Sequence, residues 1–412
     1  MQSTKIFSFF SGVGFLDLGF ETSGFEVVYS SEISPEFTQA YVYAREKLNL
    51  EIPMYGCHSG DAGDIETLVS EKGRYRLKHI VQESRRSGAV VGFIGGPPCP
   101  DFSVGGKNRG YEGDNGKLSA SYIELICQQQ PDFFVFENVK GLWSNKRHRN
   151  FYEELKAKLI QSKYIISDYL INTLEYGVPQ DRQRIIMIGI NESLISNYRK
   201  SNNEHLHTSE IDLKWNTKEV LSRDFIFSHK WPSAEEFMEN SFRSCPDNII
   251  VELTAEYWFN RNDVSSHQNS NDYFKPRAGL SRFLSVLEGD DSRKSFKRLH
   301  RWRYSPTVCY GNNEVHLHPY KARRLSVAEA LALQSMPKGF VLPPDMSLTK
   351  MFKSIGNGVP YLASKSIANI VKDFLNAPYE YHPPVKDKQK SLNLMVQRVA
   401  ESSSGIRSDF LS

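Results

Sequence analysis

The stretch from Gly92 to Gly110 constrains the fold of this chain more than any other. The apolar residues at 90–94 predict a short buried strand. Gly95-Gly96-Pro97-Pro98 then ends this strand, because proline cannot donate to the ladder of a sheet. Cys99 therefore comes at the carboxyl end of a strand, which is where open α/β sheets place ligands. Free cysteines are often buried and structural, so this position alone leaves a catalytic and a structural role open.

Composition places the chain among folded proteins. Its 412 residues have room for two or three domains, and a hydrophobic content of 40% is enough to form cores. The net charge of +3 is too small to indicate nucleic-acid binding by itself. The basic charge is local, because residues 272–324 contain 12 Lys and Arg against 5 Asp and Glu. This segment predicts a basic face for nucleic acid, although an ordinary solvated surface explains it equally well.

The five cysteines are scattered and show no CxxC or Cys/His spacing. This pattern indicates neither a disulfide framework nor a metal site. No stretch reaches the roughly 18 apolar residues that a membrane span needs. We therefore expect a cytoplasmic protein with no metal and no membrane partner.

The N-terminal stretch predicts a cradle for a nucleotide-type cofactor. A strand over Lys5–Phe10 leads into the turn Ser11-Gly12-Val13-Gly14, and a helix follows. The next strand ends at Glu32, about 20 residues after the glycines, where Rossmann-like folds keep a carboxylate for ribose. Asp61 and Asp64 then stand at a turn, where either could bind an adenine amino group or cap a helix.

Two more strand ends carry polar groups. Glu137-Asn138-Val139 follows the apolar strand Phe133–Phe136, so Glu137 should face the same crevice as Cys99. A helix cap or a structural ion pair is the alternative role for this glutamate. Gln180 to Arg184 leads into another strand, and its two arginines, two positions apart, should point the same way. They could grip a carboxylate, a phosphate or a base edge.

The rest of the chain is less regular. Residues 191–320 are polar and aromatic with weak periodicity, which predicts a second domain. Ser326 and Glu329 predict a capping box at the start of a helix. We expect a charged surface connector over 82–87 and a glycine turn over 354–360 that opens a last helix. The composition after Ala377 predicts a loosely held tail.

Taken in order, these motifs resemble those of the DNA (cytosine-5)-methyltransferase family, in its prokaryotic modification type. The resemblance covers most of residues 5–190 and 320–375. The matching motifs are Phe10–Gly14, Pro97-Pro98-Cys99, Glu137-Asn138-Val139, Gln180–Arg184, Arg324–Gln334 and Gly356–Pro360. The departures are Phe15 for a usual glycine, Pro100 for a usual glutamine and Asn115–Leu118 for a usual Arg-Gly start. None of them removes a chemical group that the reaction needs.

The resemblance implies an α/β fold with two parts. A Rossmann-like S-adenosylmethionine-dependent methyltransferase domain would be joined to a smaller, irregular target-recognition domain. The expected divisions are a catalytic domain over 1–190 completed by 350–377, a recognition domain over 191–320, a connecting helix over 321–349 and a tail over 378–412.

The resemblance also implies the reaction. A methyl group would pass from S-adenosylmethionine to carbon 5 of a cytosine flipped out of duplex DNA, leaving S-adenosylhomocysteine. Carbon 5 is a poor nucleophile, so a thiolate, that of Cys99, would first add to carbon 6. Glu137 would protonate ring nitrogen 3, and Arg184 would hold the carbonyl at carbon 2. Arg182 would support the nucleophile loop or a phosphate, while no residue is assigned as the base for the carbon 5 proton.

Further roles follow from the resemblance. Phe10 would stack on adenine, Glu32 would bind the ribose and Asp64 the adenine amino group. The implied cofactor residues are Phe10, Gly12, Val13, Gly14, Glu32, Ile33, Asp64, Ile65, Pro98, Leu118, Asn357, Gly358 and Val359. The residues expected to contact DNA are Ser103, Gln180, Lys294, Lys297 and Arg298. The last three belong to the basic stretch 293–303, which should lie against phosphates unless it is an ordinary solvated helix face.

Three other functions fit the sequence less well. A sequence-specific DNA-binding protein without catalysis is disfavoured because Cys99, Glu137 and Arg184 are all present. An RNA cytosine methyltransferase fits the long middle segment less well, and a nicotinamide oxidoreductase lacks the full GxGxxG. The chain is expected to act as a monomer, with a cognate restriction endonuclease as a separate partner. Its target sequence cannot be inferred.

Overall fold

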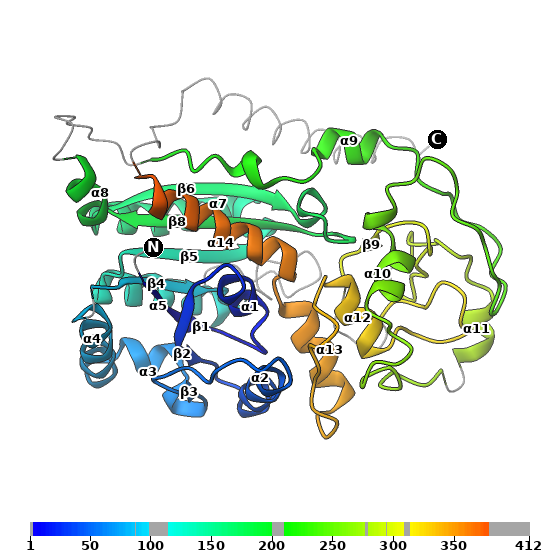
Figure 1. The fold of residues 1–412 in the computed structure, drawn as a ribbon, viewed down its shortest axis with the longest axis horizontal. Coiled ribbons are helices and arrows are strands. Elements are labelled where there is room, and N and C mark those ends of the chain that lie inside the picture. Colours follow the sequence, from blue (N-terminus) through cyan, green and yellow to red (C-terminus); the bar gives the residue numbers. More distant parts are fainter. Residues whose placement is uncertain are drawn as a thin grey trace.

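The computed structural model describes residues 3–86, 88–98, 114–199, 210–276, 279–293, 295–308 and 314–378. Within them, one seven-stranded sheet forms the centre of the larger lobe, and a lobe with little regular structure stands beside it (Figure 1). None of the helices in these ranges is long and apolar enough to cross a membrane.

The sheet is mostly parallel. Its strands, in spatial order, are β3 (Cys57–His58), β2 (Glu26–Ser31), β1 (Thr4–Phe9), β4 (Val90–Gly95), β5 (Phe133–Val139), β8 (Gln183–Asn191) and β6 (Tyr164–Asn172). The first five run parallel, whereas β8 is antiparallel to both β5 and β6. The predicted α/β, Rossmann-like class is therefore confirmed.

The direction of β8 brings the functional motifs together. Because β8 is antiparallel, its amino end lies at the edge where the parallel strands end, and Arg184 stands opposite Val139 of β5. Just before it, β7 (Gln180–Asp181) pairs with β9 (Ser305–Pro306) from the irregular lobe. The chain around the QDRQR motif therefore touches the sheet on one side and the irregular lobe on the other.

Helices cover both faces of the sheet. Successive residues of β5 alternate between two cores, with Phe133 and Val135 in one and Phe134 and Phe136 in the other. The first core is covered by α1 (Phe15–Glu21) and α14 (Tyr361–Asn376), and the second by α3 (Ile65–Val69), α4 (Glu71–Arg86), α5 (Asp114–Gln129) and α7 (Lys146–Gln161).

The surface connector expected over 82–87 is wrong for the part that the structure describes. Residues 82–86 belong to α4, which buries Leu77, Val81 and Ser84 at helical spacing. The charged residues of the segment occupy the outer side of this helix, because an amphipathic helix needs only one apolar stripe.

The irregular lobe contains short elements. They are α9 (Arg223–Ser228), α10 (Ala255–Arg261) and α11 (Leu280–Leu284), whereas α8 (Glu192–Arg199) lies beside the sheet and places Ile195 in its first core. Ile211, Leu213 and Trp215 still pack in the first sheet core, and Trp215 donates to Ser167 Oγ at 2.9 Å. The packing of the sheet thus extends past the expected boundary at residue 190.

A third core joins the two lobes. Here α12 (Val327–Leu333) is buried throughout and packs with α13 (Leu348–Asn357), α10 and α2 (Pro35–Lys47). The predicted capping box is confirmed: Ser326 and Glu329 exchange hydrogen bonds of 3.3 and 2.7 Å. The glycine turn expected over 354–360 is wrong in its first half, because 354–357 complete α13.

Helices α1 and α14 cross in close contact. Ser364 Oγ donates to the Leu16 carbonyl at 2.6 Å. A Cβ on Gly19 would lie 2.2 Å from Ser364 Oγ and 2.6 Å from the Lys365 backbone nitrogen. Only a residue without a side chain allows this approach of the two helices.

We expect Gly19→Ala to lower the free energy of unfolding by about 1–3 kcal/mol, since the added methyl forces α1 and α14 apart. Urea unfolding measures the change. Gly279→Ala is the control, because its new Cβ would meet Phe283 at an ordinary 3.5 Å. Equal stability of the Gly19 variant and the wild type would mean that the two helices do not pack this closely.

Candidate active site

The turn after β1 forms the predicted cradle. Phe10, Gly12 and Gly14 have φ angles of 52°, 55° and 90°, so the chain turns through left-handed conformations that favour glycine. A Cβ on Gly12 would meet nothing within 4 Å, which leaves the space before the turn open. The Gly12 amide donates to Glu32 Oε2 at 3.0 Å, so the turn and the carboxylate at the end of β2 lie together.

Glu32 is held in place from two sides. Its other oxygen, Oε1, accepts from the Ser34 amide at 3.0 Å. Burial raises the pKa of this carboxyl group, and the hydrogen bonds from Ser34 and Gly12 oppose that rise. Ile33, the next residue, has a side chain that is 59% exposed. An exposed apolar group beside a fixed carboxylate suits a ligand with an apolar and a hydroxylated part.

A buried network supports the turn from below. The Tyr41 ring lies 2.9 Å from where a Cβ of Gly14 would be, and Tyr41 Oη donates to Asp17 Oδ2 at 2.8 Å. Ser8 Oγ donates to the other oxygen of Asp17 at 2.6 Å. These residues were not predicted, although Phe37 and Tyr41, both buried, have the spacing of a helix face.

Asp64 caps a helix. Its side chain accepts from the Glu66 amide at 3.1 Å, at the start of α3. A Cβ on Gly63 would lie 2.5 Å from the Glu32 carbonyl, so this glycine brings the start of α3 to the end of β2. The structure therefore shows the capping role and leaves the adenine contact of Asp64 as a prediction. Ile65 is buried, with 3% exposure.

Arg182 reaches the C-terminal turn. Its Nη2 donates to the carbonyls of Gly356 and Gly358 at 2.9 and 3.0 Å, and the residue is 1% exposed. A Cβ on Gly358 would lie 2.3 Å from the Phe15 ring, so this glycine accommodates the unusual residue of the first turn. Asn357 is exposed, whereas Val359 is buried in the first sheet core.

Glu137 and Arg184 form the centre of the site. Arg184 Nε lies 3.0 Å from Glu137 Oε1, and both side chains are about nine-tenths buried, at 11% and 9% exposure. The contact is a close ion pair without the alignment of a hydrogen bond to that oxygen. A Cβ on Gly96 would lie 2.8 Å from Glu137 Oε2, so the carboxylate packs against the chain that leads to Pro97 and Pro98.

Asn138 ties the same strand to the proline loop. Its Nδ2 donates to the Pro97 carbonyl at 3.4 Å, and its Oδ1 accepts from the Val139 amide. Pro98 is half-buried, and Leu118 packs on the second sheet core. Cys99, Ser103 and Lys294 lie outside the described residues.

The DNA contact predicted for Gln180 is wrong. The residue is 0% exposed, and its Nε2 donates to the Leu333 carbonyl at 3.2 Å and to Gln334 Oε1 at 3.4 Å. Its Oε1 accepts from the Val308 amide at 3.2 Å. The amide is therefore used inside the protein, where it joins β7 to α12 and to the irregular lobe.

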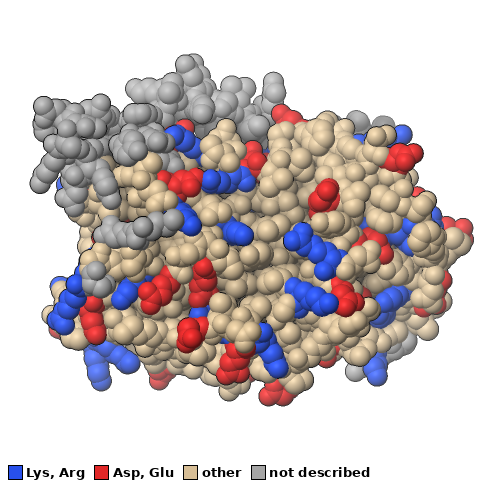
Figure 2. Space-filling model, in the orientation of Figure 1, with Lys and Arg blue, Asp and Glu red and all other residues tan. Residues whose placement is uncertain are grey.

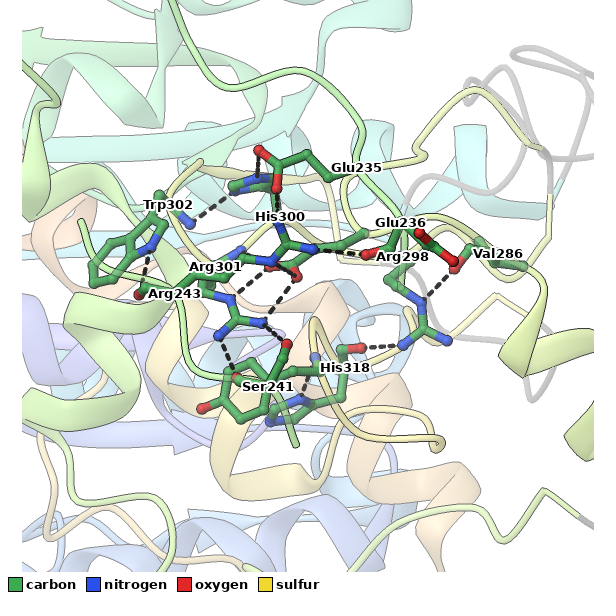
Figure 3. A network of polar contacts seen from close by, with 12 residues as sticks. Glu235, Glu236, Ser241, Arg243, Val286, Arg298, His300, Arg301, Trp302 and His318 are labelled. Carbon is green, nitrogen blue, oxygen red and sulfur yellow. Dashed lines mark hydrogen bonds and ion pairs between the residues drawn. The ribbon is translucent and has the colours of Figure 1, made fainter. Parts of the chain in front are cut away.

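The phosphate contact predicted for Arg298 is also wrong. The residue is 0% exposed and donates to the carbonyls of Val286, at 2.9 Å, and His318 (Figure 3). It also donates to the Phe283 carbonyl at 2.5 Å. Burial lowers the pKa of Arg298 to about 10. A guanidinium enclosed by carbonyl oxygens cannot reach DNA without unfolding its surroundings.

Other arginines of the basic stretch are also engaged within the protein, in ion pairs with carboxylates. Arg301 pairs with buried Glu288 at 2.8 and 2.9 Å, and Arg303 pairs with Asp291. The described part of 293–303 forms no helix, and Lys297 is half-buried. On the face shown in Figure 2, basic and acidic side chains are interspersed over both lobes. The DNA contacts of Lys294 and Lys297 stay predictions.

We expect Arg298→Met to lower the free energy of unfolding by several kcal/mol, because each buried carbonyl left without a donor costs about 1–3 kcal/mol. Chemical denaturation measures this loss. Arg293→Met, at a residue whose side chain is 41% exposed, should change little. A stable Arg298 variant whose DNA binding depends less on salt would restore the phosphate contact that the structure contradicts.

The fold and the site together define a Rossmann-like α/β protein, with a glycine cradle beside a buried carboxylate–guanidinium pair. The family model of C-5 cytosine-specific DNA methylases matches residues 4–373. The chain therefore belongs to the C-5 cytosine-specific DNA methylase family. The predicted resemblance and the predicted enzyme class, a cytosine-5 DNA methyltransferase, are confirmed.

Individual relatives support this family assignment. The chain is 51% identical to the Type II methyltransferase M.NmeDI of Neisseria meningitidis serogroup C, over 92% of this chain and 86% of that protein. It is 28% identical to M.FnuDI of Fusobacterium nucleatum, over 93% and 98%. A DNA modification methyltransferase from an E. coli prophage shares the fold, with a TM-score of 0.58 at 20% identity over 91% of this chain and 100% of that one.

Proposed function

We propose that the protein transfers a methyl group from S-adenosylmethionine to carbon 5 of a flipped-out cytosine in duplex DNA, through a covalent adduct with Cys99. The family supplies the reaction class. The observation that carries the proposal is the packing of the Glu137–Arg184 pair against the start of the Pro-Pro-Cys segment. This packing brings an acid, a cation and the segment that leads to the Cys99 thiol to one edge of the sheet.

The described residues fit the cofactor. The open space before Gly12 can admit a ligand, and Glu32 offers a fixed carboxylate to the ribose hydroxyls. Phe10 is partly exposed at the same turn, so its ring can stack on adenine. Asn357, at the end of α13, and Ile33 would line the remainder. When bound, S-adenosylmethionine supplies the methyl group, and S-adenosylhomocysteine is the product.

Chain connectivity supports the role proposed for Cys99. It follows Pro97 by two residues, which limits the distance between the two Cα atoms to about 7.6 Å. The Pro97 carbonyl accepts a hydrogen bond from Asn138, which follows Glu137 in the sequence. A thiolate on this short tether can reach a base that the Glu137 carboxyl group also touches.

The side chains then have complementary tasks. The Cys99 thiolate forms a bond to carbon 6, and the electron pair of the ring moves toward nitrogen 3, where Glu137 delivers a proton. Arg184, held by Glu137, donates to the carbonyl at carbon 2 and keeps the ring in place. After carbon 5 has taken the methyl group, a base to which no residue is assigned removes the carbon 5 proton. The double bond to carbon 6 then re-forms as the thiolate leaves, and nitrogen 3 returns its proton to Glu137. None of these steps uses a metal ion.

The wider setting follows from the substrate. A base inside a duplex is inaccessible, so the protein must turn it outward, and residues 191–320 would read the neighbouring base pairs. We infer that the protein acts in the cytoplasm as a monomer. A separately acting restriction endonuclease of the same specificity would be its counterpart, as the Type II name of the relatives suggests.

We expect Cys99→Ala to abolish methyl transfer while cofactor and DNA binding persist, because the thiol acts only after the base is seated. Duplex DNA containing 5-fluorocytosine should trap the wild type covalently, since fluorine cannot leave as a proton. Cys245→Ala, at an exposed cysteine of the irregular lobe, is the control and should stay active. Substantial methylation by the Cys99 variant would exclude Cys99 as the nucleophile.

We expect Glu137→Gln to slow the chemical step by roughly 10²–10⁴-fold, the usual contribution of a positioned acid or base. Single-turnover transfer of labelled methyl measures this step. Glu153→Gln makes the same change on the outer side of α7, where the Glu153 side chain is 47% exposed, and should have no effect. An unchanged single-turnover rate in the Glu137 variant would remove this residue from the reaction.

A further inference from the structure

Lys140 stands beside the site without an assigned role. It follows Glu137 by three residues, so the two Cα atoms lie at most about 11 Å apart. It is the first residue of α6 (Lys140–Ser144), immediately after Val139, which pairs with Arg184 across the sheet. Lys140 is therefore at the same edge as the proposed catalytic groups.

The ammonium group of Lys140 has no hydrogen bond or ion pair within the described residues, although the side chain is half-buried. Its charged neighbours are already engaged. Arg223 Nε lies 2.6 Å from Glu175 Oε1, and Asp181 Oδ1 accepts from Asn172 Nδ2 at 2.8 Å. Burial lowers the pKa of Lys140, Arg223 lowers it further, and Asp181 opposes both.

The other cations of this edge are occupied. Arg182 holds two carbonyls, Arg184 faces Glu137, and Arg223 pairs with Glu175. A partly buried cation without a partner is costly, and folded proteins keep such groups mainly where a ligand uses them. Among the described residues, the Asp181 carboxylate forms no ion pair with Lys140 and the Arg223 guanidinium repels it, so Lys140 is able to bind an anion.

We propose that Lys140 binds a backbone phosphate of the DNA strand that carries the target cytosine. The inference rests on the proposed function and deepens it. A phosphate fits better than a base edge, because an ammonium acts as a point charge without the planar geometry that reads bases. The phosphates next to the target nucleotide are the anions that must lie near Glu137 when the ring is seated there.

The test compares Lys140→Gln, Lys140→Arg and the wild type in DNA binding without cofactor. The Gln variant should bind duplex DNA about tenfold more weakly, the effect of losing one charge-assisted contact. Its slope of log affinity against log salt should flatten by about 0.9. The Arg variant should recover most of the affinity. Lys78→Gln, an exposed lysine on α4 with the same charge change, should match the wild type.

Further readouts separate a phosphate contact from a structural role. The Gln variant should keep or slightly exceed the wild-type melting temperature and should keep its cofactor affinity and preferred sequence, because Lys140 makes no stabilising hydrogen bond or ion pair with the described residues. Wild-type DNA affinity and salt slope in this variant would overturn the proposal. So would a lower melting temperature with unchanged binding, or a changed target sequence. If the wild type binds duplex DNA but does not methylate it, the proposed function is wrong. The DNA affinities of the Lys140 variants then still show whether Lys140 binds a phosphate.

Discussion

The site depends on the direction of one strand. Because β8 enters the sheet antiparallel, its first residues pair with the end of β5, at the edge where parallel strands present their functional groups. Arg184 can therefore face Glu137 at 3.0 Å although 47 positions separate them in the sequence. If β8 ran parallel, its amino end and both arginines would lie at the opposite edge. The direction of this strand is thus what brings a carboxylate and a guanidinium together at this edge of the sheet.

The turns at 10–14 and 356–360 are joined by equally specific contacts. Arg182 carries a buried positive charge, and the carbonyls of Gly356 and Gly358 are the groups that solvate it. Gly358 also leaves room for Phe15, so the first and last turns fit each other. The proposed cofactor cradle therefore combines turns that lie more than 300 positions apart in the sequence. A substitution in either turn should therefore shift the backbone of the other.

The sequence predicted what depends on local chemistry. Glycines with left-handed φ, a carboxylate about 20 residues further on and the Ser326–Glu329 box are short-range signals, and the structure contains all three. Gln180 and Arg298 were misjudged, because residue type does not reveal whether a polar side chain is enclosed by carbonyl oxygens. The Tyr41–Asp17 network, and the lack of a hydrogen bond or ion pair from Lys140 to any described residue, depend on packing between distant segments. No periodicity in one sequence reports such contacts.

The central claim is that this site methylates carbon 5 of cytosine in duplex DNA, and identification of the product tests it most directly. The protein is incubated with duplex DNA and S-adenosylmethionine carrying a labelled methyl group, and the nucleosides are then separated and mapped to their positions. The account predicts label only in 5-methylcytosine, at one recurring sequence. Label on an exocyclic nitrogen of cytosine or adenine, or transfer to RNA alone, would contradict it.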